Sequence, residues 1–265
     1  LQFIFFIINY LKYHFYKILR FSLPKSFQYK LGTSRLLKGI RNIFFRTNNK
    51  IQIIEGLIDW EKLTFYFSAS YHTFYKAQTT GIENRIIRTA LTVLNGDDTA
   101  IDVGSNYGFI TIVMGKYLFP KGKVVSFEID HSVCQVLKKT INKNNLSNNI
   151  NLIEKGAGSK ESTNKTTIDK IVNEQKLSKI KFLKIDVDGD DLDVLIGAYN
   201  TLNQFHPTVV IEMTKHEKKI YEFLINCGYK YFINQSNETV HIDNNSWPPN
   251  LIASTKKLFI PKKIF

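Results

Sequence analysis

Two residue types on which many small folds depend are scarce in this chain of 265 residues, which has two cysteines and six prolines. Cys134 and Cys227 lie far apart, with no C-x-x-C spacing and no paired histidine. This excludes a disulfide framework and a structural zinc site, and it indicates a reducing compartment. Fourteen glycines and six prolines also exclude a collagenous or a Pro/Gly-rich disordered chain. With 43% apolar residues, the chain can form one sizeable packed domain.

Acidic side chains are absent from the first fifty positions, since the first carboxylate of the chain is Glu55. The same positions hold ten Lys and Arg, whereas the remaining 26 Lys and Arg nearly balance the 23 Asp and Glu. The net charge of +13 therefore belongs mainly to an N-terminal arm. The rest of the chain lacks the strongly basic composition typical of nucleic-acid-binding domains, so a nucleic-acid partner is not expected.

The arm opens with a mostly apolar stretch, Leu1–Leu11, which is about half as long as the roughly 20 residues of a spanning helix. Written as a helix, the arm separates a polar stripe (Asn9, Lys12, Tyr16, Arg20) from an apolar one (Phe3, Ile7, Leu11, Ile18). This pattern is typical of a helix that lies in the membrane interface. We expect residues 1–50 to bind an anionic membrane surface, which makes the protein cytoplasmic and peripheral on the inner face. A helix packed on the core and a truncated anchor are the alternatives.

From about residue 96 the chain alternates strands, glycine turns and helices, as in a parallel sheet with crossover helices. Strands are predicted at 99–103, 123–128, 150–153, 182–186 and 208–213. Helices are predicted at 108–118, 132–142, 167–175, 190–202 and 218–227, and edge strands at 230–232, 240–242 and 257–260. Residues 51–95, with a helix at 82–94, are interpreted as a lead-in and not as a separate domain.

The sharpest motif is the segment 101–109, in which a strand enters a glycine turn and then a helix. Gly104 allows a tight turn, Gly108 a close approach of the helix, and the first helical amides can bind a carboxylate. Asp102 supplies an acceptor that suits an ammonium group. An adenosyl cofactor fits this pattern, whereas the G-x-x-x-G spacing differs from the G-x-G-x-x-G of dinucleotide sites. A plain tight turn is the alternative interpretation.

A second candidate, Glu128, ends the second predicted strand and follows Asp102 by 26 positions. Rossmann-like folds place an acid at a comparable offset, where its carboxylate accepts hydrogen bonds from ribose hydroxyls. A solvent-facing acid at the end of a strand is the alternative.

A dense run of carboxylates follows the fourth predicted strand, from Asp186 to Asp193. It does not fit an EF-hand, because its glycine is the fourth residue and no glutamate stands at position twelve, so no metal is expected. Asp190 and Asp191 are predicted to start and cap the next helix. Asp186 and Asp188 remain as site candidates.

Two of these segments are similar to motifs of the FkbM family of S-adenosylmethionine-dependent methyltransferases. The family's D-V-G-A-N-x-G is matched by residues 102–108, with Ser105 in place of Ala. Its F-E-P is matched by residues 127–129, with Ile129 in place of Pro.

The third family motif, K-I-D-V-E-G-x-E-x-x-V-L-x-G-A, corresponds to residues 184–198. Asp188 and Asp191 stand in place of its two glutamates, which retracts each carboxylate by one methylene. The resemblance covers about residues 80–265 and leaves the basic arm outside.

The resemblance implies an α/β, Rossmann-like class I methyltransferase domain over residues 96–265. Its sheet would be mostly parallel, with helices on both faces and an antiparallel C-terminal edge. The implied cofactor is S-adenosylmethionine. The implied reaction is O-methylation of a hydroxyl on a small-molecule or glycan acceptor, namely a sugar, a polysaccharide or a secondary metabolite.

The resemblance also implies which residues bind the cofactor. Asp102, Gly104 and Asn106 would surround the methionine part, Glu128 the ribose, and Gly156 and Ala157 the adenine, with Ser105, Gly108 and Ile129 completing the motif positions. A base for the acceptor would lie just after the fourth and fifth strands, where the sequence has Asp186, Glu212 and His216. Asp186 is the expected positioning residue, and His216 is a base candidate.

Other methyltransferase classes fit less well. An amine methyltransferase of nucleic acids would carry D-P-P-Y or a similar loop where this chain has Asp186-Val187-Asp188-Gly189. A cytosine-C5 enzyme needs a nucleophilic cysteine in a site loop, whereas both cysteines here fall in or at predicted helices. The remaining alternative is a non-catalytic, membrane-associated or cofactor-sensing module with the same fold.

Overall fold

The computed structural model describes residues 52–243 and 246–265. The predicted arm, residues 1–50, lies outside this range, so its membrane association stays a prediction. Within the described residues, no helix combines the length and apolar character needed to cross a membrane.

The described chain begins with a β-hairpin of β1 (Ile53–Trp60) and β2 (Leu63–Ser70), followed by α4 (Tyr71–Thr79) and α5 (Asn84–Val93). The hairpin forms because alternating residues of both strands are buried, among them Trp60 and Phe65. No glycine stands in the turn of this hairpin, residues 61–62. The turn uses Glu61 instead, in the left-handed region at φ +50°.

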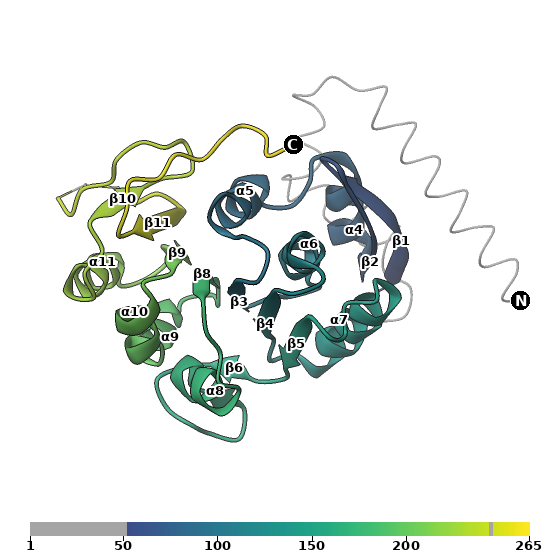
Figure 1. Ribbon diagram of the computed structural model, residues 1–265, viewed down its shortest axis with the longest axis horizontal. Coiled ribbons are helices and arrows are strands. Elements are labelled where there is room, and N and C mark those ends of the chain that lie inside the picture. Colours follow the sequence, from purple (N-terminus) through teal and green to yellow (C-terminus); the bar gives the residue numbers. More distant parts are fainter. Residues whose placement is uncertain (1–51, 244–245) are drawn as a thin grey trace, which may run out of the picture. The chain divides into compact units, whose positions relative to one another are not determined.

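The central sheet has seven strands in the order β10-β11-β9-β8-β3-β4-β5 (Figure 1). The strands are β3 (Thr99–Val103), β4 (Lys123–Phe127), β5 (Ile150–Ile153), β8 (Ile180–Ile185), β9 (Thr208–Glu212), β10 (Tyr231–Ile233) and β11 (Asn250–Ser254). Neighbours from β9 to β5 pair in parallel, whereas β11 pairs antiparallel with both β9 and β10. A short parallel pair, β6 (Gly156–Ala157) and β7 (Lys165–Thr166), stands apart. The mostly parallel sheet with an antiparallel C-terminal edge is confirmed.

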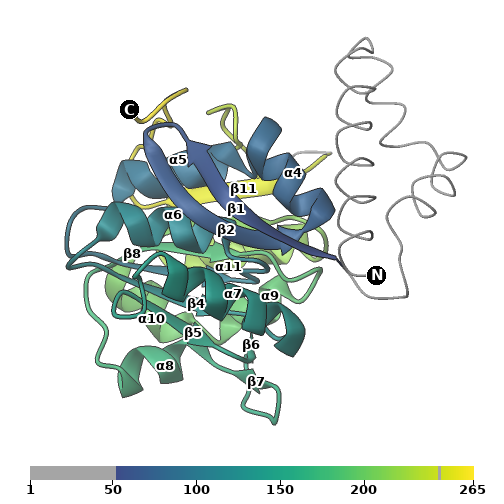
Figure 2. The ribbon, with the colours of Figure 1, turned by 90° about the vertical axis from the view of Figure 1, so that its right-hand side faces the viewer.

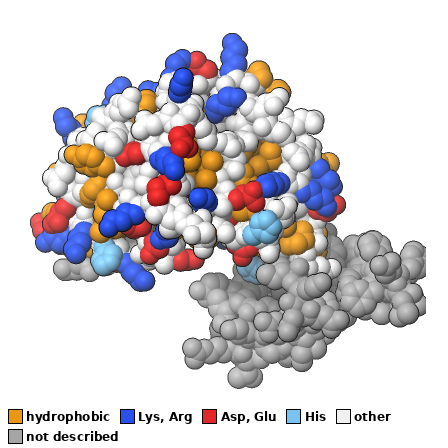
Figure 3. Space-filling model, turned by 90° about the horizontal axis from the view of Figure 1, so that it is seen from below, with side chains coloured by type: hydrophobic (Ala, Val, Ile, Leu, Met, Phe, Trp, Pro, Cys, Tyr) orange, Lys and Arg blue, Asp and Glu red, His pale blue; other side chains and the backbone are white. Residues whose placement is uncertain are grey.

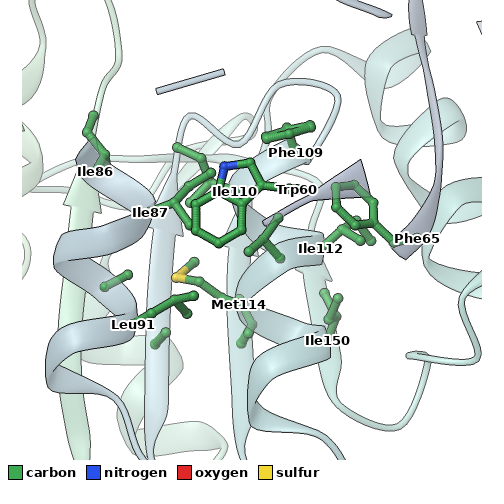
Figure 4. Close-up of a cluster of buried hydrophobic side chains, with 14 of the residues drawn as sticks. Trp60, Phe65, Ile86, Ile87, Leu91, Phe109, Ile110, Ile112, Met114 and Ile150 are labelled. Atoms are coloured by element: carbon green, nitrogen blue, oxygen red, sulfur yellow. The ribbon is translucent and has the colours of Figure 1, made fainter. Parts of the chain in front are cut away.

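Helices cover both faces of the sheet (Figures 1 and 2). One apolar cluster joins the hairpin, α4 and α5 with α6 (Phe109–Leu118) and α7 (His131–Lys143), and Figure 4 shows part of it around Trp60 and Met114. The other cluster contains side chains of α8 (Ile168–Glu174), α9 (Asp191–Ile196), α10 (Tyr199–Phe205) and α11 (Glu217–Asn226). Successive side chains of a strand point to opposite faces of the sheet and so join different clusters. In β3, Ala100 belongs to the first cluster and Ile101 to the second.

The helix predicted at 190–202 is wrong, because the chain breaks into α9 and α10 at Gly197–Ala198. Gly197 packs against the backbone of Gly158, where an added Cβ would lie 1.9 Å from the Gly158 oxygen. The Gly197 carbonyl also accepts a hydrogen bond from the Asp169 amide at 3.0 Å. Both contacts are long-range, which is why the local periodicity suggests one continuous helix.

The predicted edge strands are only partly correct. The segment 230–232 corresponds to β10, but 240–242 and 257–260 form no strand, and β11 lies at Asn250–Ser254 instead. The side chain of Asn237 takes the place of a ladder at 257–260, since it accepts from the Ile260 amide at 2.8 Å and donates to the Ile260 carbonyl at 3.0 Å. The strand β11 was missed although Leu251, Ile252 and Ala253 are buried.

Asn144, just after α7, ties the hairpin to the sheet layer. Its buried side chain accepts from the Tyr66 amide at 2.9 Å and donates to the carbonyls of Tyr66 at 2.7 Å and Thr140 at 2.8 Å. The residue therefore acts as a substitute strand partner for β2.

We expect Asn144→Ala to lower the free energy of unfolding by about 1–3 kcal/mol, because it leaves the Tyr66 backbone groups without their partners. Urea unfolding followed by circular dichroism measures this change. The matched control is Asn148→Ala, which changes an exposed asparagine in the turn just before β5. Equal midpoints for the two variants would contradict the assigned role.

Candidate cofactor and acceptor site

The main cleft lies at the carboxyl ends of β3, β4 and β8 and has a volume of about 490 Å³. The strands that follow β3 in the chain, β4 and β5, lie on one side of it in the sheet. The chain then crosses to β8 on the opposite side of β3, so the strand order reverses at β3. Parallel α/β sheets bind ligands at such a switch point. Eight of the nine predicted cofactor residues line the cleft: Gly104, Ser105, Asn106, Gly108, Glu128, Ile129, Gly156 and Ala157.

The turn after β3 is locked between its two neighbouring strands. The amides of Gly104 and Ser105 both donate to the Phe127 carbonyl at 3.0 Å. Gly104 has φ +73°, and a Cβ there would lie 1.9 Å from the Asp186 carbonyl oxygen, so only glycine fits. The turn is therefore a rigid part of the cleft wall.

The helix α6 begins directly at the cleft. Gly108 occupies its N-cap position, and no side chain caps the first turn. Phe109 and Ile110 line the cleft. The first amides of a helix lack intrahelical partners and attract negative charge, so this end of α6 can receive a carboxylate.

Glu128 is held in place by the backbone. Its Oε2 accepts from the Asn106 amide and its Oε1 from the Asp130 amide, both at 2.8 Å. A carboxylate has about four lone-pair positions, so both oxygens keep capacity for further donors. The neighbouring Ile129 is 55% exposed and lies against Gly156, which leaves an apolar surface beside the carboxylate.

Asp102, the ninth predicted cofactor residue, lies beneath the turn, and its side chain is fully buried. Its Oδ2 accepts from the Thr111 hydroxyl at 2.5 Å, and its Oδ1 lies 3.4 Å from the Lys184 Nζ. The structure thus pairs Asp102 with an internal cation and does not place it on the cleft wall.

Lys184 sits in β8 directly opposite Asp102, and its side chain is 3% exposed. Its Nζ also lies 3.3 Å from the Asp186 Oδ2 and donates to the Gly104 carbonyl at 3.1 Å. Burial disfavours the charged amine, but the carboxylates of Asp102 and Asp186 outweigh it and raise the pKa of Lys184. Lys184 is therefore a buried, ionised centre below the cleft.

The three base candidates lie in different surroundings. Asp186 lines the cleft, and since Ile185 pairs with Ile211, Glu212 follows on the adjacent strand. Burial, together with the negative charges of Asp186, Asp191 and Asp188, raises the pKa of Glu212 to about 7. Neither Glu212 nor His216 is among the described residues that line the cleft, and His216 is exposed at the N-cap of α11.

The carboxylate run after β8 divides into a structural and an exposed part. Asp191 is buried and accepts from the amides of Val187 at 3.2 Å and Gly189 at 3.1 Å, so it holds the loop in shape. As predicted, Asp190 and Asp191 start the next helix, with Asp190 at the N-cap position of α9. Contrary to the prediction, the Asp190 side chain pairs with Lys165 at 2.7 Å and makes no capping hydrogen bond. Asp188, at φ +54°, is exposed on the cleft.

Sequence reasoning missed two charged residues of the site. Lys184 belongs to the third family motif, but no functional role was predicted for it. A lysine within an apolar parallel strand needs a buried counter-ion, and the strand register places Asp102 opposite it. Glu83, which lines the cleft from the lead-in, has no local motif that could have identified it.

We expect Lys184→Met to destabilise the fold by about 3–5 kcal/mol, because it leaves the buried Asp102 carboxylate without a counter-ion. Adding Asp102→Asn should recover much of this loss. Lys181→Met, which removes an exposed lysine from the same strand, is the control in urea unfolding. A Lys184→Met variant as stable as that control would refute the assigned ion pair.

Comparison with known proteins links the chain to methyltransferases in two places. Residues 154–231 match the model of the methyltransferase FkbM domain. Residues 70–176 match that of protein-L-isoaspartate(D-aspartate) O-methyltransferase. A search of curated proteins gives no match.

Solved structures of methyltransferases resemble the chain at low identity. A methyltransferase FkbM from Methylobacillus flagellatus is 18% identical with a TM-score of 0.47, over 60% of this chain and 43% of that one. This chain thus spans less than half of that relative. Aeropyrum pernix fibrillarin, with natively bound S-adenosyl-L-methionine, is 12% identical with a TM-score of 0.44, over 77% and 100% of the two chains.

The family match and the strand order agree with the motifs. The predicted resemblance to FkbM methyltransferases is confirmed by the family model over residues 154–231. The chain has the fold of the class I methyltransferases, whose cofactor is S-adenosylmethionine.

Proposed function

We propose that the chain transfers a methyl group from S-adenosylmethionine to a hydroxyl oxygen of a sugar, a glycan or a secondary metabolite. One observation carries this proposal: the predicted cofactor residues and Asp186 line one cleft, and Glu212 lies on the strand adjacent to Asp186. A cofactor position and a proton acceptor are thereby brought to the same edge of the sheet.

The residues of the cleft fit the three parts of the cofactor. Glu128, held by two backbone amides, can accept from the ribose hydroxyls. The exposed face of Ile129, with Ala157, offers an apolar place for the adenine. The uncapped start of α6 suits the carboxylate of the amino-acid part. A volume of about 490 Å³ is typical of small-molecule sites.

The chemistry asks little of the protein beyond alignment and one proton transfer. When bound, the cofactor supplies a methyl group on a sulfonium, which is already a good electrophile. The chain must hold the acceptor oxygen in line and take its proton as the oxygen gains the methyl group. A carboxylate whose pKa is near neutral suits this task, and the pKa of Glu212 is raised to about 7. We assign Glu212 as the base and Asp186 as the residue that positions the acceptor.

Charge at the cleft favours a neutral, polyhydroxylated acceptor. Asp186 and Asp188 line the cleft after β8, and Glu212 is the last residue of the adjacent strand β9, so negative charge gathers here and would repel a phosphate backbone. On the face shown in Figure 3, Lys and Arg are interspersed with Asp and Glu, without a basic field. Hydroxyl groups, in contrast, donate readily to carboxylates.

Binding of S-adenosylhomocysteine tests the cofactor site. Glu128→Gln should weaken binding about tenfold or more, because it removes charge-assisted hydrogen bonds to the ribose. Isothermal titration calorimetry measures this, with circular dichroism to verify folding and Glu222→Gln, an exposed change on α11, as control. Absence of binding by the folded wild-type chain would refute the proposal. Binding without methyl transfer to any hydroxylated acceptor would instead favour a cofactor-sensing module.

The pH dependence tests the base. Glu212 must be deprotonated to accept a proton, so kcat should rise with pH through a midpoint near 7. Glu212→Gln should lower kcat by about 100-fold or more and abolish this rise. His216→Gln is the comparison, since it removes the rival candidate. A rise that survives in Glu212→Gln and disappears in His216→Gln would transfer the role to the histidine.

A further inference from the structure

Glu83 occupies an unusual backbone position beside the cleft. It precedes α5 with φ +48°, in the left-handed region that few residues other than glycine adopt. Its carbonyl accepts from the amides of Ile86 at 2.9 Å and Ile87 at 3.1 Å. These two hydrogen bonds hold the Glu83 backbone at the start of α5.

The next residue anchors this conformation to the hairpin. The Asn84 Oδ1 accepts from the Trp60 indole at 2.8 Å, and its Nδ2 donates to the Thr80 carbonyl at 2.8 Å. Trp60 is itself buried in the core of the hairpin layer. The lead-in therefore fixes the backbone at Glu83 beside the cleft, and Glu83 is among the residues that line it.

In the part of the chain that the structure describes, the Glu83 carboxylate has no direct counter-ion. Within the described residues no hydrogen bond or ion pair to it is found. Lys184, the nearby internal cation, is already shared by Asp102, Asp186 and the Gly104 carbonyl. Burial raises the pKa of Glu83, and the charges of Asp186 and Asp102 raise it further, whereas Lys184 and, more weakly, Lys76 lower it. A cationic group of a ligand would relieve this imbalance.

We infer that Glu83 receives the α-ammonium group of the cofactor's amino-acid part, the place that the sequence analysis gave to Asp102. This inference rests on the proposed function. Asp102 is paired with Lys184 and Thr111 beneath the turn, whereas Glu83 lies on the cleft wall together with Phe109 and Ile110 at the start of α6. The ammonium would meet Glu83 and the carboxylate would meet the helix, so opposite charges of the ligand face opposite charges of the protein.

The test is a binding cycle on the full chain, with S-adenosylhomocysteine and its analogue in which a hydrogen replaces the amino group. The wild-type chain should bind the analogue at least tenfold more weakly. In Glu83→Gln this difference should vanish, because the partner of the amino group is gone. Glu128→Gln should weaken both ligands and keep the difference, and Glu222→Gln should change neither affinity.

Asp102→Asn in the same cycle separates the two carboxylates. Because Asp102→Asn weakens the ion pair that holds the cleft turns, it should lower the affinity for both ligands together and keep the tenfold difference, with circular dichroism to verify folding. Loss of the difference in folded Asp102→Asn but not in Glu83→Gln would overturn the inference. Should Glu83→Gln fail to fold, Glu83→Asp retains the charge one methylene further back and is expected to shrink the difference. A wild-type chain that binds both ligands equally also overturns the inference. A wild-type chain that binds neither refutes the cofactor assignment itself, and the two failures are thereby distinguished.

Discussion

The contact on which the site depends is the buried ion pair between Lys184 and Asp102. It joins the two central strands of the sheet, β8 and β3, at paired positions, each next to the last residue of its strand. Through Asp186 and the Gly104 carbonyl, the same ammonium group also holds both turns that form the cleft. A buried charge is costly unless it is fully paired, so this arrangement fixes the relative position of the two turns tightly. The proposed cofactor and acceptor parts of the cleft thus share one internal anchor.

Much of the sheet was predictable because its signals are local. The strand at 99–103, the glycine turn and the following helix are encoded in consecutive residues, and so are the segments around Glu128 and Asp186. The failures have long-range causes. The break at Gly197 follows from the approach of Gly158, and the absence of a strand at 257–260 follows from the side chain of Asn237.

The site shows the same division between local and long-range signals. Eight predicted cofactor residues gather on the cleft because the motifs stand at the carboxyl ends of neighbouring parallel strands. The role expected of Asp102 required knowing what lies opposite it in the sheet, and the strand register supplies Lys184. Glu83 could not be identified at all from local sequence, since its position depends on the contact between Asn84 and Trp60, 24 residues earlier in the chain.

The hydrogen bond between Asn84 and Trp60 of the hairpin also limits where this chain can be joined to another protein in a chimaera. Thr73, Ile82 and Glu83 contribute to the cleft wall, although all three precede the first strand of the central sheet. A chimaera joined at residue 96 would combine the complete central sheet with cleft-wall residues from another protein. The smallest exchangeable module therefore begins at the hairpin, and a graft of the α/β portion alone would inherit the fold without the full binding surface.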